Sequence, residues 1–227
     1  MAFFPTLCVE DFFPNPDQIR NYALTSSELN WRPAEDGAWP GVRSCCLREV
    51  NYNLFREIAT RYFLLHYAPN QLPEISFEAS MRFQRIKKKC VGGWVHNDYP
   101  DVQSQLIYLT PNAPLNSGTG LYKLKDISNF KGFEESKKKL FNNEVSSEEV
   151  EKDRIENNNQ FEKTAYFSNI YNRCVCFDCS IWHCGDEFPG EDERLTLIIF
   201  WEKINGPMTS LQNSKSFPSG TTGNIVV

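Results

Sequence analysis

Apolar residues in the first third of the chain recur at helical spacing. Between residues 50 and 67 this period is carried by Leu54, Phe55, Ile58, Tyr62 and Leu65. The pattern predicts a helix that lies with one face against a sheet. Upstream, Asn15 followed by Pro16 offers an N-cap and a first-turn proline, so a helix over about 16–26 is expected. Residues 30–46, rich in Pro, Gly and Trp, are expected to form an ordered loop.

From Glu74 onward the apolar period changes from helical to twofold. One face of this segment carries Ile75, Phe77, Ala79, Met81 and Phe83, and the other carries Ser76, Glu78, Ser80, Arg82 and Gln84. Strict alternation predicts a strand with one buried face. Further strands are expected at about 94–97, 103–110, 119–124, 163–168, 173–178, 181–187 and 194–204.

The order of these elements predicts a mainly β fold with N-terminal helices. Helices followed by roughly eight short strands favour a double-sheet jelly roll. A charged, Asn-rich stretch over 125–162 interrupts the strands and is expected to form one or two surface helices and a mobile loop. We expect one domain over 1–227, with helical support in 1–70, the core in 71–205 and a polar tail in 206–227.

Composition limits the classes of function. The 227 residues are 41% hydrophobic and 14% aromatic, and the net charge is −5, so no overall field favours nucleic acid. Two triple-lysine runs, 87–89 and 137–139, are expected on solvated surface or at a strand edge. No apolar run approaches the ~20 residues that cross a bilayer, and the N-terminus lacks the basic flank of a signal peptide. A soluble, cytoplasmic protein is expected, and its oligomeric state cannot be read from the sequence.

The eight cysteines are expected to be reduced thiols, because the chain is not small and carries no export signal. Four of them cluster: Cys174, Cys176, Cys179 and Cys184. Their spacing lacks the paired C-x2-C knuckles of common zinc folds, and cysteine in a strand packs as a small hydrophobe. A cysteine-based zinc protein therefore stays as an alternative hypothesis.

Two histidines and one aspartate form a candidate metal site. His96 and Asp98 lie two residues apart at a strand start, where i and i+2 point to the same side. His183 lies in a strand-like segment far downstream. If the three meet, two imidazoles and one carboxylate occupy one face of a metal, which suits non-haem Fe(II). The plain alternatives are a His–Asp hydrogen bond at a strand end and a satisfied core histidine.

Arg194 strengthens the candidate site. It opens the apolar strand RLTLIIFW eleven residues after His183, and an arginine there needs an anionic partner or an exit to solvent. A bound dicarboxylate would supply that partner through two parallel hydrogen bonds. Thr196 is on the same face and can donate another. The alternative is an ion pair with Glu191 or Asp186.

The order H-x-D, a distant His and then Arg resembles the Fe(II)/2-oxoglutarate-dependent dioxygenase superfamily, in its prolyl 4-hydroxylase-like branch. SGTGLY, residues 117–122, is similar to the Gly-Gly-x-Thr-x-Phe turn of that branch. DFFPNPDQIRNYAL, PGVRS and YNRCVCFDCSIWH are similar to a set of bacterial and phage oxygenase-like proteins. The resemblance covers most of the chain and is weakest in 125–162 and after 205.

The resemblance implies a double-stranded β-helix with Fe(II) held by His96, Asp98 and His183. It implies that Arg194 binds the distal carboxylate of 2-oxoglutarate, with Thr196, Tyr108 and Thr119 as cosubstrate neighbours. The cofactors would be Fe(II), 2-oxoglutarate and O2, with ascorbate as an optional reductant. One departure stands out. Some members have a tyrosine on the strand before H-x-D, where MRFQRI offers Arg82, Gln84 or Arg85.

The substrate class stays open at this stage. A peptidyl residue such as proline, an amino acid or a small metabolite would suit the chemistry, whereas nucleic acid and membrane partners are not expected. Trp31, Trp39 and Trp94 are either cleft residues or core. The segment 125–162 is either a lid over the substrate or an idle surface insertion. The rival function is a non-catalytic cupin-like or β-sandwich module that binds a metal or ligand without turnover.

Overall fold

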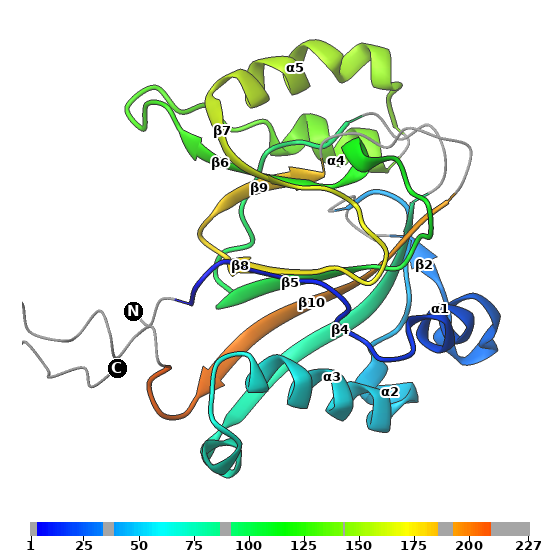
Figure 1. Cartoon of the computed structure of the whole chain (residues 1–227). Helices are drawn as coiled ribbons and strands as arrows, with labels where there is room; N and C mark the ends of the chain where they lie inside the picture. The colour runs from blue at the N-terminus through cyan, green and yellow to red at the C-terminus, as the bar shows by residue number, and fades with distance from the viewer. Residues whose placement is uncertain (1–3, 34–38, 87–91, 143, 186–192, 210–227) are drawn as a thin grey trace, which may run out of the picture.

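Two antiparallel sheets face each other in this chain (Figure 1). The structure, a computed structural model, describes residues 4–33, 39–86, 92–142, 144–185 and 193–209. The large sheet has seven strands in the order β1-β8-β5-β10-β4-β3-β2, and the small sheet has three in the order β7-β6-β9. The expected mainly β fold with supporting helices is confirmed.

The strands of the large sheet are β1 (Leu7–Val9), β2 (Arg32–Pro33), β3 (Val42–Arg43), β4 (Ser76–Ile86), β5 (Gln103–Tyr108), β8 (Cys174–Asp178) and β10 (Arg194–Asn205). Those of the small sheet are β6 (Thr119–Leu124), β7 (Phe161–Phe167) and β9 (Trp182–Gly185). The α-helices are α1 (Pro16–Thr25), α2 (Leu47–Val50), α3 (Tyr52–Leu64), α4 (Glu134–Phe141) and α5 (Ser147–Asn159). Short 3-10 turns occupy Ser27–Leu29, Pro69–Glu74 and Leu115–Ser117.

The helices α1, α2 and α3 cover the outer face of the large sheet, where the main core lies (Figure 1). The apolar face predicted from residue 54 to residue 65 belongs to α3. The fully buried Trp201 of β10 stacks on Tyr62 of α3, with ring centroids 4.1 Å apart. Asn51 caps α3 by accepting a hydrogen bond from Leu54 N at 3.1 Å. Asn15 precedes α1 as expected, but its side chain makes no capping hydrogen bond.

Alternation along β10 divides its side chains between the two faces of the large sheet. Leu195, Leu197, Ile199 and Trp201 belong to the main core. Because successive side chains on a strand point to opposite faces, Arg194, Thr196, Ile198 and Phe200 face the small sheet instead. β10 pairs with β4 on one side and β5 on the other, so it runs between two other strands of the sheet. The end that begins at Arg194 therefore lies deep in the space between the sheets.

The segment 125–162 folds into α4 and α5; α5 lies beyond the small sheet and α4 lies beside it (Figure 1). The expectation of one or two helices here is confirmed. The C-terminal end of α5 bonds to the chain just before His96: Asn158 Oδ1 accepts from Val95 N at 2.9 Å, and Asn157 Nδ2 donates to Val95 O at 3.1 Å. The insertion is thus bound to the main chain that leads into the candidate site.

Two local expectations are wrong. Residues 94–97 do not form a strand, since only His96 makes an isolated bridge. The backbone of Val95 is satisfied by the asparagine side chains of α5, which replace a strand partner. Residues 30–46 contain two short strands, β2 and β3, within the expected loop. The triple-lysine run 87–89 and most of the polar tail lie outside the described residues.

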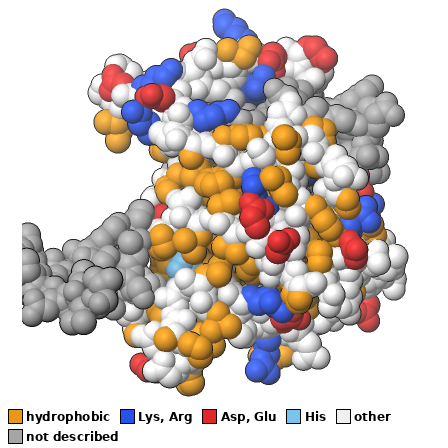
Figure 2. Space-filling view, viewed as in Figure 1, with side chains coloured by type: hydrophobic (Ala, Val, Ile, Leu, Met, Phe, Trp, Pro, Cys, Tyr) orange, Lys and Arg blue, Asp and Glu red, His pale blue; other side chains and the backbone are white. Residues whose placement is uncertain are grey.

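The visible surface agrees with the modest net charge. On the face shown in Figure 2, lysine and arginine side chains are interspersed with aspartate and glutamate, and no basic surface gathers there. Among the described residues, every helix is too short or too polar to cross a membrane.

Candidate metal centre

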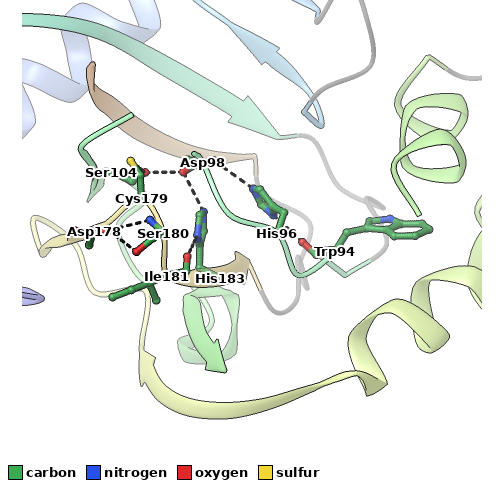
Figure 3. Close-up of polar contacts among 9 residues, drawn as sticks. All are labelled: Trp94, His96, Asp98, Ser104, Asp178, Cys179, Ser180, Ile181 and His183. Atoms are coloured by element: carbon green, nitrogen blue, oxygen red, sulfur yellow. Dashed lines mark hydrogen bonds and ion pairs between the residues drawn. The ribbon is translucent and has the colours of Figure 1, made fainter. Parts of the chain in front are cut away.

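His96, Asp98 and His183 converge in the space between the sheets (Figure 3). Each offers one ligand atom, and the three atoms lie within 4.8 Å of one another. His96 Nε2 is 3.7 Å from Asp98 Oδ1, and His183 Nε2 is 3.2 Å from Asp98 Oδ2. Among the described residues, no other set of His, Cys, Asp and Glu brings three such atoms this close.

Main-chain hydrogen bonds position all three residues. His96 and His183 form an antiparallel bridge, with 3.0 Å from His96 N to His183 O and 2.7 Å from His183 N to His96 O. Asp98 N donates to Cys179 O at 3.0 Å, just before β9 begins. The same-side geometry expected for i and i+2 is present, although the segment is a bridge and not a full strand.

Each imidazole is oriented by a hydrogen bond from its Nδ1. His96 Nδ1 lies 2.8 Å from Trp94 O, and His183 Nδ1 lies 3.0 Å from Ile181 O (Figure 3). A carbonyl oxygen only accepts, so Nδ1 carries the proton and the Nε2 of a neutral ring presents its lone pair towards Asp98. This arrangement is the usual support of a metal-binding histidine.

The histidine at position 96 is neutral at physiological pH. Burial, together with the nearby Lys137 and His183, lowers the pKa of His96 to about 3. Its side chain is 38% exposed and lines the cavity described below. A neutral imidazole is the form that binds a metal.

Asp98 is held as a carboxylate. Burial raises its pKa, but the neighbouring His183 and His96 and the Ser104 hydroxyl together bring the pKa well below its usual range. Ser104 Oγ donates to Asp98 Oδ2 at 2.5 Å and lies 3.3 Å from Cys179 Sγ. Burial raises the pKa of Cys179 well above its ordinary value, so this residue remains a thiol. The donor set is therefore two imidazoles and one carboxylate, which suits Fe(II), Mn(II) or a similar divalent ion.

A cavity of about 330 Å³ joins this triad to Arg194. Arg194 is only 8% exposed, and its guanidinium carbon lies 5.6 Å from the centroid of the Tyr108 ring. Burial lowers the pKa of Arg194, while Tyr108 and Tyr166 oppose that shift. An arginine remains cationic even so. The cavity thus combines a candidate metal centre with a buried positive charge.

The other expected cosubstrate neighbours lie around Arg194. Tyr108 O–H donates to Thr119 Oγ1 at 2.7 Å, and both side chains are buried. Thr119 lines the cavity, whereas Tyr108 lies behind it and contacts Arg194. Thr196 is directly opposite Tyr108 in the β10–β5 register and is fully buried. Its hydroxyl has no hydrogen-bond partner among the described residues, and it does not line the cavity.

The strand before H-x-D contributes differently from the tyrosine of some oxygenases. Gln84 lines the cavity and donates from Nε2 to Pro40 O at 2.9 Å. Arg82 Nη1 donates to Ser44 O at 3.0 Å. Arg85 pairs with Glu193 at 2.6 Å. The alternative ion-pair partners considered for Arg194, Glu191 and Asp186, lie outside the described residues.

The cysteines do not form one four-ligand site in the described structure. Cys174 and Cys176 belong to the main core, with their sulfur atoms 3.7 Å apart. Cys179 contacts Ser104, and Cys184 lines the cavity. The four side chains therefore lie in three different surroundings, of which Cys174 and Cys176 share one.

Several cavity residues were not anticipated from the sequence. Lys137 and Phe141 of α4 line the cavity, so the expectation that the whole run 137–139 lies on solvated surface is wrong at Lys137. Arg43 of β3 also lines it and was not anticipated. Trp39 and Trp94, expected as either cleft or core residues, line the cavity too. Trp31 packs against the main core instead. The sequence carries no local signal for Arg43 or Lys137, because sheet register and helix rotation place them.

Solved structures with a similar fold include oxygenases. A prolyl hydroxylase from Trichoplax adhaerens, in complex with a hypoxia-inducible-factor peptide fragment, matches with a TM-score of 0.51 and 11% identity, covering 94% of this chain and 87% of that one. HygX from Streptomyces hygroscopicus, with nickel and 2-oxoglutarate bound, matches with a TM-score of 0.56 and 13% identity, covering 87% and 82%. The non-haem α-ketoglutarate-dependent epimerase SnoN from nogalamycin biosynthesis matches with a TM-score of 0.51 and 11% identity. The match covers 96% of this chain and 86% of that one.

At these identities the likeness establishes the fold. The expected resemblance to the Fe(II)/2-oxoglutarate oxygenases, prolyl hydroxylases included, is confirmed at that level. No curated protein matches this sequence. One family model matches residues 4–192, and the chain accordingly belongs to the family described as "Family of unknown function (DUF6445)".

Proposed function

We propose that this chain is a non-haem Fe(II)- and 2-oxoglutarate-dependent dioxygenase. The observation that carries the proposal is that one cavity is lined both by His96, Asp98 and His183 and by the buried Arg194. Three protein ligands on one side of an ion leave positions open for a chelating cosubstrate and O2. With iron, 2-oxoglutarate and O2 bound, the site would supply oxidative chemistry that hydroxylates a C–H bond and releases succinate and CO2.

The residues of this chain take defined roles in the proposal. His96, Asp98 and His183 hold the metal, and their hydrogen bonds to Trp94 O, Ser104 and Ile181 O keep the donor atoms aimed inward. Arg194 grips the distal carboxylate of 2-oxoglutarate.

The proposed carboxylate site at Arg194 is surrounded by Tyr108, Thr119 and Thr196. Tyr108 and Thr119, joined by a hydrogen bond, fix the wall next to the guanidinium. The buried hydroxyl of Thr196, two residues along the same face, is a further donor for the carboxylate.

The architecture fits this role. Two antiparallel sheets enclosing a metal cavity are what a double-stranded β-helix, or jelly roll, provides. We propose that residues 1–227 act as one oxygenase domain. Its substrate would be a peptidyl residue, an amino acid or a small metabolite; one structural neighbour was solved with a peptide and another with hygromycin B.

The test measures succinate formed from 2-oxoglutarate by protein loaded with Fe(II), under air and with ascorbate. It is run without a candidate substrate and then with each member of a panel of amino acids and peptides. We expect turnover by the native chain and none by His96→Ala or Arg194→Ala. The matched controls are His66→Gln, in the third histidine of the chain, and Arg48→Ala, in an exposed arginine. Metal binding without any succinate would instead favour the non-catalytic binding module.

A further inference from the structure

The cavity holds more positive charge than the proposed reaction uses. Among the described residues that line it, three are cations, Arg43, Lys137 and Arg194, and one is an anion, Asp98. A divalent ion and the 2-oxoglutarate dianion would cancel each other. With Arg194 assigned to 2-oxoglutarate, two cations remain without a role.

Arg43 is stacked on aromatic rings and has no anionic partner among the residues that the structure describes. It lies on β3 with its guanidinium carbon 4.1 Å from the centroid of the Trp39 ring and 5.4 Å from that of Phe200. No described residue forms an ion pair or hydrogen bond with its side chain, and its Nε is buried without an acceptor. Burial lowers the pKa of Arg43 to about 10, so it stays charged at neutral pH. Stacking on Trp39 fixes the plane of the guanidinium and leaves its edge available.

Lys137 also lines the metal cavity, but from helix α4, whereas Arg43 lines it from β3 of the large sheet. It lies on α4, which is joined to α5 by a hydrogen bond from Ser136 to Asp153 and packs on Trp94 through Phe133. It makes no ion pair with a described residue. Burial lowers its pKa, and the carboxylates of Asp98 and Glu134 oppose that shift, whereas Arg43 adds to it. Arg43 and Lys137 are therefore two cations within electrostatic reach of each other and of the candidate metal centre.

A second cavity extends the positive charge outward. It measures about 530 Å³, shares Trp39 and Arg43 with the metal cavity, and is also lined by Arg32, Arg82 and Glu49. A cleft with an excess of one sign raises the local concentration of the opposite charge. Arg43 thus stands between an outer basic cavity and the metal cavity.

We propose that the primary substrate carries an anionic group, a carboxylate or a phosphate, that binds between Arg43 and Lys137 beside the metal. The inference rests on the proposed function and narrows its substrate class to acidic small molecules or acidic residues. Burial of these two cations in one cavity carries a desolvation cost and mutual repulsion, which the single carboxylate of Asp98 offsets only in part. An anion between them would relieve both costs and orient the rest of the substrate towards the metal.

The test uses the full chain with Mn(II) in place of iron and saturating 2-oxoglutarate, without O2. Paramagnetic Mn(II) shortens the nuclear relaxation times of small molecules that bind near it. The probes are acetate and inorganic phosphate, with acetamide as the neutral match for acetate. Separate titrations of Mn(II) and of 2-oxoglutarate report whether the site assumed by the proposed function exists.

We expect acetate or phosphate to be relaxed in the native chain and acetamide not to be. The two probes separate a carboxylate site from a phosphate site. Arg43→Gln and Lys137→Gln should each raise the Kd of the anion at least about tenfold, as loss of a charge-assisted hydrogen bond does. The matched controls Arg48→Gln and Lys138→Gln, exposed cations on α2 and α4, should leave it unchanged.

Three results would overturn the proposal. Equal relaxation of acetate and acetamide, or none of either anion, would exclude an anion site next to the metal. Relaxation that persists in Arg43→Gln and Lys137→Gln would mean that the anion binds the metal itself. Failure of Mn(II) or 2-oxoglutarate to bind the native chain would overturn the proposed function too, and the separate titrations identify that case.

Discussion

His96 and His183 exchange two backbone hydrogen bonds, and this single antiparallel bridge sets their imidazole centroids 4.5 Å apart. Directly paired residues on antiparallel chains place their side chains on the same side. The main chain, more than side-chain packing, therefore brings both Nε2 atoms to Asp98. Changes to that bridge should affect metal binding even when the ligands themselves are kept.

Mn(II) should stabilise the folded chain, because the proposed ligands are together only in the folded state. At a free Mn(II) concentration 100 times Kd the expected gain is about 2.7 kcal/mol, or roughly 5–10 °C in Tm for a chain of this size. Thermal unfolding with and without Mn(II) measures it, and a chelator should reverse it. His183→Ala should remove the gain, whereas His66→Gln should keep it. An undiminished gain in His183→Ala would place the ion elsewhere.

Ser104→Ala should weaken metal binding without removing a ligand. Its hydroxyl donates to Asp98 Oδ2 at 2.5 Å and orients that carboxylate. Loss of such a supporting bond typically costs about 10–100-fold in metal affinity. Calorimetric titration with Mn(II) measures the change. Ser180→Ala is the matched control, since that hydroxyl donates to the carboxylate of Asp178 and not to a proposed ligand. An equal effect of both substitutions would contradict a specific role for Ser104.

Gly93→Ala should disturb the His96–His183 bridge from three residues away. Gly93 N donates to Gly185 O at 2.8 Å, and an added Cβ would lie 2.2 Å from that same oxygen. The backbone of β9 would have to shift, and His183 with it. We expect weaker Mn(II) binding and a lower Tm.

Gly132→Ala is the control for that substitution. A Cβ at this position would meet only the flexible end of Glu134. Metal affinity that is unchanged in Gly93→Ala would show that the main chain near Gly185 can move without moving the ligand.

The sequence was sufficient where local periodicity decides the structure. Alternation from Ser76 to Phe83 predicted the two faces of β4, and the helical period around Ile58 predicted α3. The spacing of His96 and Asp98 predicted that they share one side. The partner of these two, His183, followed from the order of residues in a resembling family and not from periodicity.

The sequence alone did not predict the features of the structure that tertiary contacts determine. Trp94 and Val95 suggested a strand, but they pack into two different hydrophobic clusters, and the side chains of Asn157 and Asn158 take the place of a neighbouring strand. Lys137 cannot be told from Lys138 in a run of three lysines until the rotation of α4 is known. Ser104 carried a weak signal, since a polar residue between Gln103 and Gln105 in a buried strand calls for a partner.

Acid should destabilise the chain through His66. Burial lowers the pKa of His66 to about 4, from an ordinary value near 6.5. Between these values the unfolded chain binds a proton that the folded chain does not, so the free energy of unfolding falls as pH falls from 6.5 to 4. The loss is up to about 3 kcal/mol, complete near pH 4. Urea unfolding of metal-free protein at pH 7.5 and 4.5 measures it.

His66→Phe tests that assignment. His66 packs between Phe4 and Tyr62, and its Nε2 has no hydrogen-bond partner among the described residues, so an aromatic replacement preserves the packing. Between pH 7.5 and 4.5, the free energy of unfolding should fall by about 2–3 kcal/mol less in the variant than in the native chain. An identical loss in both proteins would assign the acid sensitivity to other groups.

Arg194→Lys should weaken 2-oxoglutarate binding while the charge is kept. A guanidinium offers two parallel donors to a carboxylate and stacks over Tyr108, and an ammonium does neither as well. We expect the Kd of 2-oxoglutarate, titrated without O2 into the Mn(II) protein, to rise about 10–100-fold. Tyr108→Phe, which keeps the ring and loses the hydroxyl contacts with Thr119, Phe167 O and Arg194, should have a smaller effect than loss of the guanidinium. Arg61→Lys, in a surface pair with Glu57, should have none. If Arg194→Lys binds 2-oxoglutarate like the native chain, the distal carboxylate rests on another residue and the proposed clamp is wrong.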